Sequence, residues 1–435
     1  MATAENSLLG FAAQSAIGSE VTTDASFDYL YFTDGAMGVN NINLPLDPEI
    51  GGGAMLRNIV RAGVSTAGQI TFIPRPKTLA KIASGVLGSA TINNYGVNWD
   101  AFGSGWITSS QTYNATLATA NPVEVLVVKT GASNIVISGE DESSQAINYT
   151  IAPASGPGRY TSTQTFKKIT GVTVPSGAKL KLGIRETGAK TYVAKLDQSD
   201  QFSIPYHTVR FLPGKLWKET YVDTRFVALG LEWAASQFMR GTLAMLGRQP
   251  KFANDTSLTA SPDNGSPFVG VSGYVEFGGT SLKTIGGNFA VQNQVSMDEE
   301  YVIGSYYPET LSIVSRTAAI NFIVKIDDAD LYKKMMYNPS ASNEWSEQIM
   351  RDGNFVFSLA SEPRASSTSP FSSGAPSDYQ ALRNRIMIYA DMDAQKMAWT
   401  ATPIGLRAQR QITMQMSGLF LADVDPITIE VVAVD

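Results

Sequence analysis

The chain has 435 residues, which is long enough for two or three domains. It contains no cysteine, which excludes a disulfide framework, a thiol nucleophile and a thiolate metal site. Charged residues make up 17% of the chain, against roughly 25% in ordinary soluble domains, and its 38 glycines indicate a β-rich protein with many turns. A surface of low charge is also compatible with extensive cover by partner subunits. No apolar run approaches the ~20 residues that cross a bilayer, so we expect no membrane span.

The negative charge of the chain is concentrated before its first basic residue, Arg57. The formal net charge is −6, and the remainder of the chain is nearly balanced. An acidic segment of this kind repels nucleic acid rather than gripping it. A solvated acidic arm explains the composition equally well. The segment contains seven acidic residues: Glu5, Glu20, Asp24, Asp28, Asp34, Asp47 and Glu49.

The first predicted elements precede residue 63. Residues 7–20 are predicted to form an arm or a short strand, and the aromatic run 29–32 is suited to a strand. Residues 47–54 contain a proline and three glycines, which predict a loop.

Residues 63–87 are predicted to form a strand followed by an amphipathic helix. Ile70 and Phe72 alternate with polar residues, which is the period of a half-buried strand. Beyond two prolines, Thr78 can cap a helix. The apolar residues that follow then recur at helical spacing on one face: Leu79, Ile82, Ala83, Val86 and Leu87.

A sequence similar to this strand and helix recurs 252 residues later, and the two stretches align without gaps. Residues 65–72 align with residues 317–324, and Asp330 takes the place of Thr78 ahead of a predicted helix over residues 330–336. A second echo relates residues 240–247 to residues 411–418 at an offset of 171. Two short matches can arise by chance. A duplication explains both only if the first half contains an insertion of about 80 residues.

An insertion of that size is present between about residues 119 and 200. The segment contains five or six short alternating stretches separated by turn residues, a pattern typical of a small antiparallel sandwich. We therefore predict a mainly β fold with duplicated β-sandwich or barrel domains, each with a short flanking α-helix, and an inserted small β-sandwich domain. The predicted limits are 1–118 and 201–255 for the first repeat domain, 119–200 for the insertion, and 256–435 for the second repeat domain.

Residues 360–378 are predicted to form a long loop in the second half. They contain Ser, Pro and Gly but hardly any large apolar side chain except Phe371. Such a loop cannot offset its own ordering entropy. We expect it to be mobile in the free chain and to become ordered through contacts with a partner.

No pattern of catalytic or ligand-binding residues stands out. The single histidine, His207, lacks the context of a catalytic triad and is interpreted as structural. Asp327, Asp328 and Asp330 fit a helix N-terminus better than a metal site. Glycine pairs near residues 104 and 157 lack the rest of a dinucleotide fingerprint. We predict no catalytic, cofactor or metal site and no enzymatic activity.

The arrangement resembles that of the tail tube (major tail) proteins of bacteriophages with long non-contractile tails. The resemblance rests on residues 16–20, on the unit at 63–87, on the strand at 240–247 and on a second half that repeats this plan. The chain is most similar to the version with two tube domains. Residues 135–139 and 163–174 of the insertion resemble a β-rich segment found in virion structural proteins.

The resemblance implies a structural virion protein that polymerises as stacked rings into the tail tube, the conduit for DNA from capsid to host cell. Three two-domain chains would form a pseudo-hexameric ring around a tape measure protein, and DNA would later pass without sequence-specific binding. The protein would be located in the virion tail after assembly in the host cytoplasm. Candidate inter-ring contacts are Phe371, Arg364, Glu49 and Ile50. Candidate lumen charges are Asp24, Asp28, Asp34, Asp47 and Glu49.

Two other interpretations remain open at this stage. The chain is also compatible with a neck or tail-terminator protein, or with a tube component of an injection system, since the duplication fits these equally. The second is a glycan-binding or glycan-cleaving β-protein, in which Trp99 or Trp106 stacks on a sugar near paired carboxylates.

Overall fold

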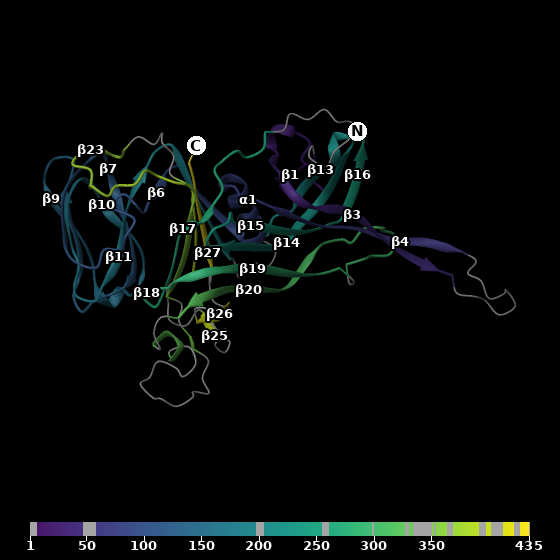
Figure 1. Ribbon diagram of the computed structural model, residues 1–435. Helices are drawn as coiled ribbons and strands as arrows, with labels where there is room; N and C mark the ends of the chain where they lie inside the picture. Colours follow the sequence, from purple (N-terminus) through teal and green to yellow (C-terminus); the bar gives the residue numbers. More distant parts are fainter. Residues whose placement is uncertain are drawn as a thin grey trace.

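A computed structural model of the chain consists largely of antiparallel strands in three sheets (Figure 1). The predicted mainly β fold is confirmed. The structure describes residues 7–46, 58–196, 204–254, 261–297, 300–326, 330–333, 350–351, 354–362, 369–390, 397–401, 412–421 and 427–434.

The first sheet has 13 strands and forms the wall of the molecule. Its main part follows the order β3 (Phe32–Pro45), β4 (Ile59–Phe72), β15 (Arg240–Gly247), β14 (Lys218–Ala234), β19 (Thr284–Ser296), β20 (Ser312–Lys325), β26 (Thr413–Phe420), β25 (Met397–Ala401) and β21 (Met350–Arg351). The first part of β14 turns away from this wall and pairs with a smaller group of strands: β16 (Gln249–Ala253), β13 (His207–Leu212), β1 (Leu8–Ala13) and β2 (Asp28–Leu30).

The other two sheets have seven strands each. The C-terminal sheet contains β18 (Thr280–Ser281), β17 (Val269–Phe277), β22 (Phe355–Ala360), β24 (Arg385–Tyr389), β27 (Thr428–Val434), β12 (Ala189–Leu196) and β5 (Gly88–Asn93). The insertion sheet, at the left of Figure 1, contains β6 (Gly96–Asn98), β11 (Lys179–Glu186), β7 (Gln111–Lys129), β10 (Gly158–Thr173), β8 (Ile135–Glu140), β9 (Ala146–Ile151) and β23 (Phe371–Ser373).

The two halves of the chain contain the same set of strand pairings. In the first half β1 pairs with β13, β13 with β14, β14 with β16 and β15, β15 with β4, and β4 with β3. In the second half β17 pairs with β22, β22 with β24, β24 with β27, β25 with β26, β26 with β20, and β20 with β19. Strands β24 and β25 together take the place of the long β14. Each half is therefore one copy of a common architecture, which we call a repeat.

The hairpins β3–β4 and β19–β20 match residue for residue at the offset of 252. Gly35 lies opposite Ile70, and Gly287 lies opposite Phe322. A β-bulge follows Ile42 in the first hairpin and Gln294 in the second, again 252 positions apart. Because a bulge is a specific local irregularity, its recurrence at the same position indicates a shared origin of the two hairpins.

The structure also matches the second pair of similar segments, residues 240–247 and 411–418, but with a shift of two residues from the sequence alignment. A row across the first repeat runs through Leu229, Leu243, Ile70 and Gly35, and the corresponding row of the second repeat runs through Ala401, Met416, Phe322 and Gly287. Leu243 is therefore matched by Met416, whereas the sequence alignment placed it over Met414. Side chains alternate along a strand, so a shift of two keeps the same residues on the buried face.

Helix α1 (Pro76–Leu87) packs its apolar face between the wall and the C-terminal sheet, against β14, β12 and β27. Leu79, Ile82 and Val86 are fully buried, as the helical spacing predicts. The predicted cap is wrong: the N-cap is Arg75, and Thr78 lies inside the first turn. In the second repeat residues 330–333 are helical, and the rest of the predicted helix lies outside the described residues. Among the described residues there are also short 3-10 turns at Asp24–Ser26, Pro153–Ser155 and Pro213–Lys215.

Strand pairing crosses the predicted limits of the insertion. β7 begins before residue 119, and β12, which precedes residue 200, pairs with β5 and β27 in the C-terminal sheet. β23 from the second half adds to the insertion sheet. The insertion is therefore joined to both halves by backbone hydrogen bonds, and its domain limits stay a prediction.

Candidate assembly surfaces

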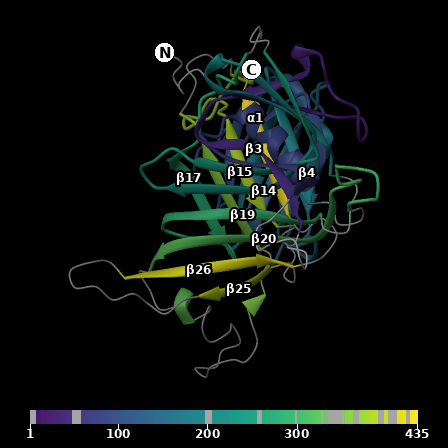
Figure 2. The ribbon, with the colours of Figure 1, turned by 90° about the vertical axis from the view of Figure 1, so that its right-hand side faces the viewer.

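A single seam joins the two repeats within the wall. Residues 228–234 of β14 pair with residues 286–292 of β19, so that Leu229 lies opposite Val291. Figure 2 shows β15, β14, β19, β20, β26 and β25 as successive rungs of one sheet. Among the described residues, the first repeat contributes four strands to this wall and the second contributes five, counting the short β21. The backbone hydrogen bonds of the seam join the two sets.

In the part of the chain that the structure describes, the wall has an open strand edge at both ends. Among the described residues, β3 pairs only with β4, and β25 has β21 on its outer side only at Ala398 and Trp399. An open strand edge presents unpaired N–H and C=O groups to another chain. The two free edges also correspond to the two strands that meet in the seam: β3 corresponds to β19, and β25 corresponds to part of β14.

The distal end of the β3–β4 hairpin, which we call the arm (residues 39–46 and 58–62), extends away from the rest of the molecule (Figure 1). Leu44, Ile59 and Val60 are 61%, 60% and 57% exposed, and Val39, Ile42 and Leu46 are also exposed. A concentration of exposed apolar side chains on one projecting segment marks a site of protein association.

The N-terminal acidic residues are in part neutralised by cations from other segments. Asp24 contacts Arg210, and the carboxylate of Asp28 lies 2.6 Å from the Lys81 ammonium. The acidic segment is therefore not the uniformly negative face that the charge count suggested. Asp34 is exposed on β3 and accepts a hydrogen bond from the backbone N–H of Gly35. Asp47 and Glu49 lie outside the described residues.

Phe371 is buried inside the single chain. It is 8% exposed on β23 and packs against Phe102 and Tyr379, with ring centroids 5.7 and 5.6 Å apart. The expectation that residues 360–378 lack ordered contacts in a single chain is therefore wrong at this position, because β7 offers an edge to pair with. A role for Phe371 between rings stays a prediction. Arg364 and Ile50 lie outside the described residues.

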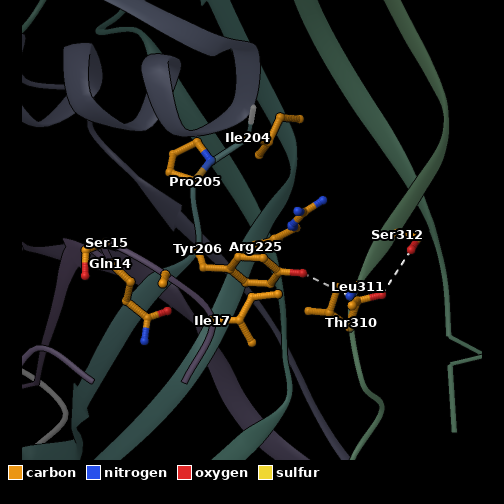
Figure 3. Close-up of a pocket in the computed structure, with 11 residues that line it drawn as sticks. Gln14, Ser15, Ile17, Ile204, Pro205, Tyr206, Arg225, Thr310, Leu311 and Ser312 are labelled. Carbon is orange, nitrogen blue, oxygen red and sulfur yellow. Dashed lines mark hydrogen bonds between the residues drawn. The ribbon is translucent and has the colours of Figure 1, made fainter. Parts of the chain in front are cut away.

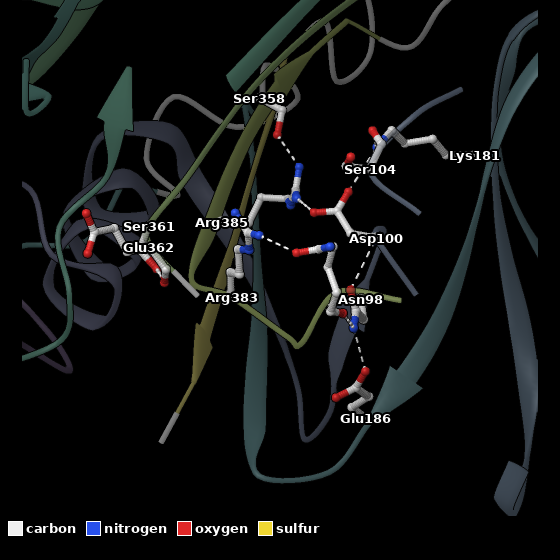
Figure 4. Close-up of polar contacts among 11 residues, drawn as sticks. Asn98, Asp100, Ser104, Lys181, Glu186, Ser358, Ser361, Glu362, Arg383 and Arg385 are labelled. Carbon is white, nitrogen blue, oxygen red and sulfur yellow. Dashed lines mark hydrogen bonds and ion pairs between the residues drawn. The ribbon is translucent and has the colours of Figure 1, made fainter. Parts of the chain in front are cut away.

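A buried ionic cluster fixes the insertion sheet to the C-terminal sheet (Figure 4). Lys181 donates to Asp100 with 3.0 Å between Nζ and Oδ1, and Arg385 from the C-terminal sheet contacts the second carboxylate oxygen. Burial alone would raise the pKa of Asp100, but the charges of Arg385 and Lys181 hold it below its usual range. Beside this trio, Asn98 donates to Glu186 over 2.7 Å.

A second ionic cluster acts across the same junction. Arg185 and Glu124 of the insertion sheet lie 2.6 Å apart, and Arg159 contacts both Glu124 and Glu430 of β27. Burial raises the pKa of the Glu430 carboxyl, and the charge of Arg159 opposes that rise. These buried charges are paired with one another across the two sheets. We therefore assign them a structural role, in which they hold the insertion sheet against the C-terminal sheet, rather than a catalytic one.

The residues considered for chemistry have structural surroundings. His207 is buried and stacks on Phe226 with ring centroids 4.1 Å apart, and burial lowers its pKa to about 4. Within the described ranges, no group of three or more His, Asp or Glu side chains is placed to hold a metal ion. In the same ranges, no helix is long and apolar enough to cross a membrane.

Residues 4–368 match the family model for phage tail tube proteins. The chain belongs to this family. It is accordingly a structural protein of the phage tail tube, a component of the virion tail that self-assembles into a tube, and the family is not one of enzymes. No curated protein matches the sequence. The family match supports the tube assignment, and no observation favours the neck, terminator, injection-system or glycan-binding alternatives.

Sequence reasoning missed the seam and the arm of this tail tube protein. A usable signal was present, because the offset of 252 extends upstream into β3. Gly35, Val39 and Asn41 recur as Gly287, Val291 and Asn293. An alignment extended in that direction would have identified β3 as the counterpart of a strand inside the wall.

Proposed function

We propose that three copies of this tail tube protein close a ring by repeating, between chains, the seam that joins the repeats within one chain. The observation that carries the proposal is the pairing of β14 with β19. The counterpart of β19 is β3. The counterparts of Ala228 and Leu229, at the start of this part of β14, are Thr400 and Ala401 at the end of β25, and those of residues 230–234 lie outside the described residues. The β25 edge of one chain then pairs with the β3 edge of the next, and closure removes both open edges.

The register of this intermolecular seam follows from the internal one. Leu229 lies opposite Val291 within the chain. The repeat counterpart of Leu229 is Ala401, and that of Val291 is Val39. Ala401 of one chain is therefore expected opposite Val39 of the next chain.

A closed ring of three chains contains six repeats, and its wall lines a continuous lumen. In this proposal the two tube domains comprise residues 1–118 with 201–255 and residues 256–435. Stacked rings form the conduit for DNA, with a tape measure protein in the lumen before ejection, and assembly takes place in the host cytoplasm. The family membership and the free strand edges support this arrangement. Exposed acids such as Asp34 on β3 would reduce the adhesion of passing DNA.

A designed disulfide tests the seam. The chain has no cysteine, so the double variant Val39→Cys and Ala401→Cys has no competing thiol. Oxidation of assembled protein should give covalent dimers and a product that ends at three chains on a non-reducing gel, because a closed ring offers no further ends. The single variants serve as controls. A ladder that continues beyond three chains, or the absence of cross-links in tubes seen by electron microscopy, would contradict the proposal.

A further inference from the structure

The end of the β19–β20 hairpin is anchored on the body of the first repeat. The backbone N–H of Val64 donates to the carbonyl of Tyr306 over 2.8 Å, and Arg248 Nε donates to the carbonyl of Pro308 over 2.5 Å. Tyr301 packs closely against Gly63. This end of the second hairpin is thus held by polar and apolar contacts with the repeat that precedes it in the chain.

Leu311 lies at the centre of this contact. Its side chain is fully buried, and its backbone N–H donates to the hydroxyl of Tyr206 over 3.1 Å (Figure 3). It lines a cavity of about 350 Å³ together with Ile204, Pro205 and Arg225 of the first repeat. Ile313, two residues along the strand, is 4% exposed. The second hairpin therefore supplies an aliphatic side chain that inserts into the first repeat.

The first hairpin has the same structure but no such partner within the described chain. Both β-bulges and the cross-strand register recur at the offset of 252. The counterpart of Leu311 at this offset is Ile59, which is 60% exposed. The same backbone thus holds a buried aliphatic residue in one repeat and an exposed one in the other.

We propose that the arm of one copy packs on the second repeat of the preceding copy in the ring, with Ile59 in the place that Leu311 takes on the first repeat. The inference rests on the proposed ring closure. Within one chain, the seam brings the β19–β20 hairpin onto the first repeat, and the seam between chains would bring the arm onto the second repeat of the neighbouring chain in the same way. The partner is a second copy of this chain for two reasons. The contact between the two repeats of one chain shows how such a hairpin packs on a repeat, and the exposed aliphatic residues of the arm lie next to the β3 edge that pairs in the proposed seam. The arm contact would then fix the angle between neighbouring chains, which backbone pairing alone leaves free to twist.

The variant Ile59→Asp tests this contact. Ile59 is exposed in the single chain, so the thermal midpoint of the monomer should not change. The critical concentration for assembly, measured by sedimentation and electron microscopy, should rise at least tenfold, because a carboxylate would be buried at the contact. The variant Ile59→Leu should assemble as the parent does. The matched control is Ile92→Asp, which places the same charge at a residue that is 58% exposed on β5.

The outcomes separate this inference from the ring closure on which it rests. Each substitution is combined with the Val39→Cys and Ala401→Cys pair. If the parent shows the seam cross-link and Ile59→Asp assembles with unchanged critical concentration, the arm contact is refuted while the seam stands. If Ile92→Asp impairs assembly as much as Ile59→Asp, the effect is general charge repulsion and the inference is also refuted. Absence of the cross-link in the parent overturns the ring closure and the arm contact together.

Discussion

The carboxylate of Asp263 caps helix α1 by accepting two hydrogen bonds from Thr78. Oδ2 of Asp263 lies 3.0 Å from the backbone nitrogen of Thr78 and 3.2 Å from its hydroxyl oxygen. Asp263 lies in the link between the repeats, which is the segment between β16 and β17, and is 185 residues from Thr78. The link between the repeats is thereby attached to the helix of the first repeat, where a negative charge also favours the positive end of the helix dipole.

Replacement of Asp263 by alanine should destabilise the first repeat. The change removes the acceptor for the Thr78 N–H, and loss of a cap costs about 0.5–2 kcal/mol. Urea unfolding of the monomer, followed by circular dichroism, should show this decrease. The variant Asp263→Asn keeps an acceptor oxygen and should lose less. Equal stability of the parent and Asp263→Ala would show that the cap carries no net free energy.

Loss of the Asp100 carboxylate should cost far more than loss of a surface carboxylate. Asp100→Ala leaves the buried Lys181 and Arg385 without their shared anion, and breaking a buried pair typically costs about 3–5 kcal/mol. The matched control is Asp28→Ala, because the Lys81 and Asp28 side chains are 44% and 32% exposed. An exposed pair contributes about 0–1 kcal/mol. Comparable losses in the two variants, measured by urea unfolding, would contradict the assigned role of the cluster.

Stability should fall as the pH rises because of Glu186. Burial raises the pKa of its carboxyl to about 7, although the hydrogen bond from Asn98 opposes the rise. Between pH 4.5, the ordinary value for Glu, and about 7, the folded state therefore binds the proton more tightly than the unfolded state. The stabilisation is complete below this window and is lost through it, on the order of 3 kcal/mol in total.

The comparison with Glu186→Gln isolates this effect. The difference in unfolding free energy between the parent and Glu186→Gln should change across pH 4.5–7. Glu430, whose pKa burial also raises, is present in both proteins and cancels. A difference that is constant with pH would mean that Glu186 ionises in the folded protein as it does in water.

Alanine should be poorly tolerated at Gly35 and Gly287. A Cβ at Gly35 would clash with the carbonyl oxygen of Gln69, and one at Gly287 would clash with that of Asn321, the repeat counterpart of Gln69. Gly35 also has a φ of +130°, which side chains rarely adopt. Because backbone atoms must move, each substitution should cost about 1–3 kcal/mol. Gly38→Ala is the control, since its Cβ would meet nothing within 4 Å. A loss at Gly38 as large as at Gly35 would refute the clash as the cause.

The sequence was sufficient for elements whose period is strong. The alternation at Ile70 and Phe72 and the helical spacing from Leu79 to Leu87 depend on local patterns, and the structure confirms both. The duplication was visible because each repeat keeps buried residues at matching positions. Element boundaries and helix caps were harder to predict from the sequence. The cap of α1, for example, comes from Asp263, which no local pattern around Thr78 could indicate.

Long-range pairing explains what the sequence did not reveal. Phe371 is the one large apolar residue in a polar stretch, and its burial depends on the free edge of β7, more than 240 positions away. The ionic cluster around Asp100 joins residues from three separate segments. The arm contains apolar residues that resemble those of any strand, and only the structure distinguishes the exposure of Val39 and Ile59 from the burial of their counterparts Val291 and Leu311.

The insertion interrupts only one of the two repeats. In a ring of three chains, the wall strands therefore follow a near six-fold pattern, whereas the inserted sheets occur at every second position. The outside of such a tube would display three ridges per ring rather than six. Any ligand or decoration protein that binds the insertion would saturate at three copies per ring, half the number expected from the symmetry of the lumen.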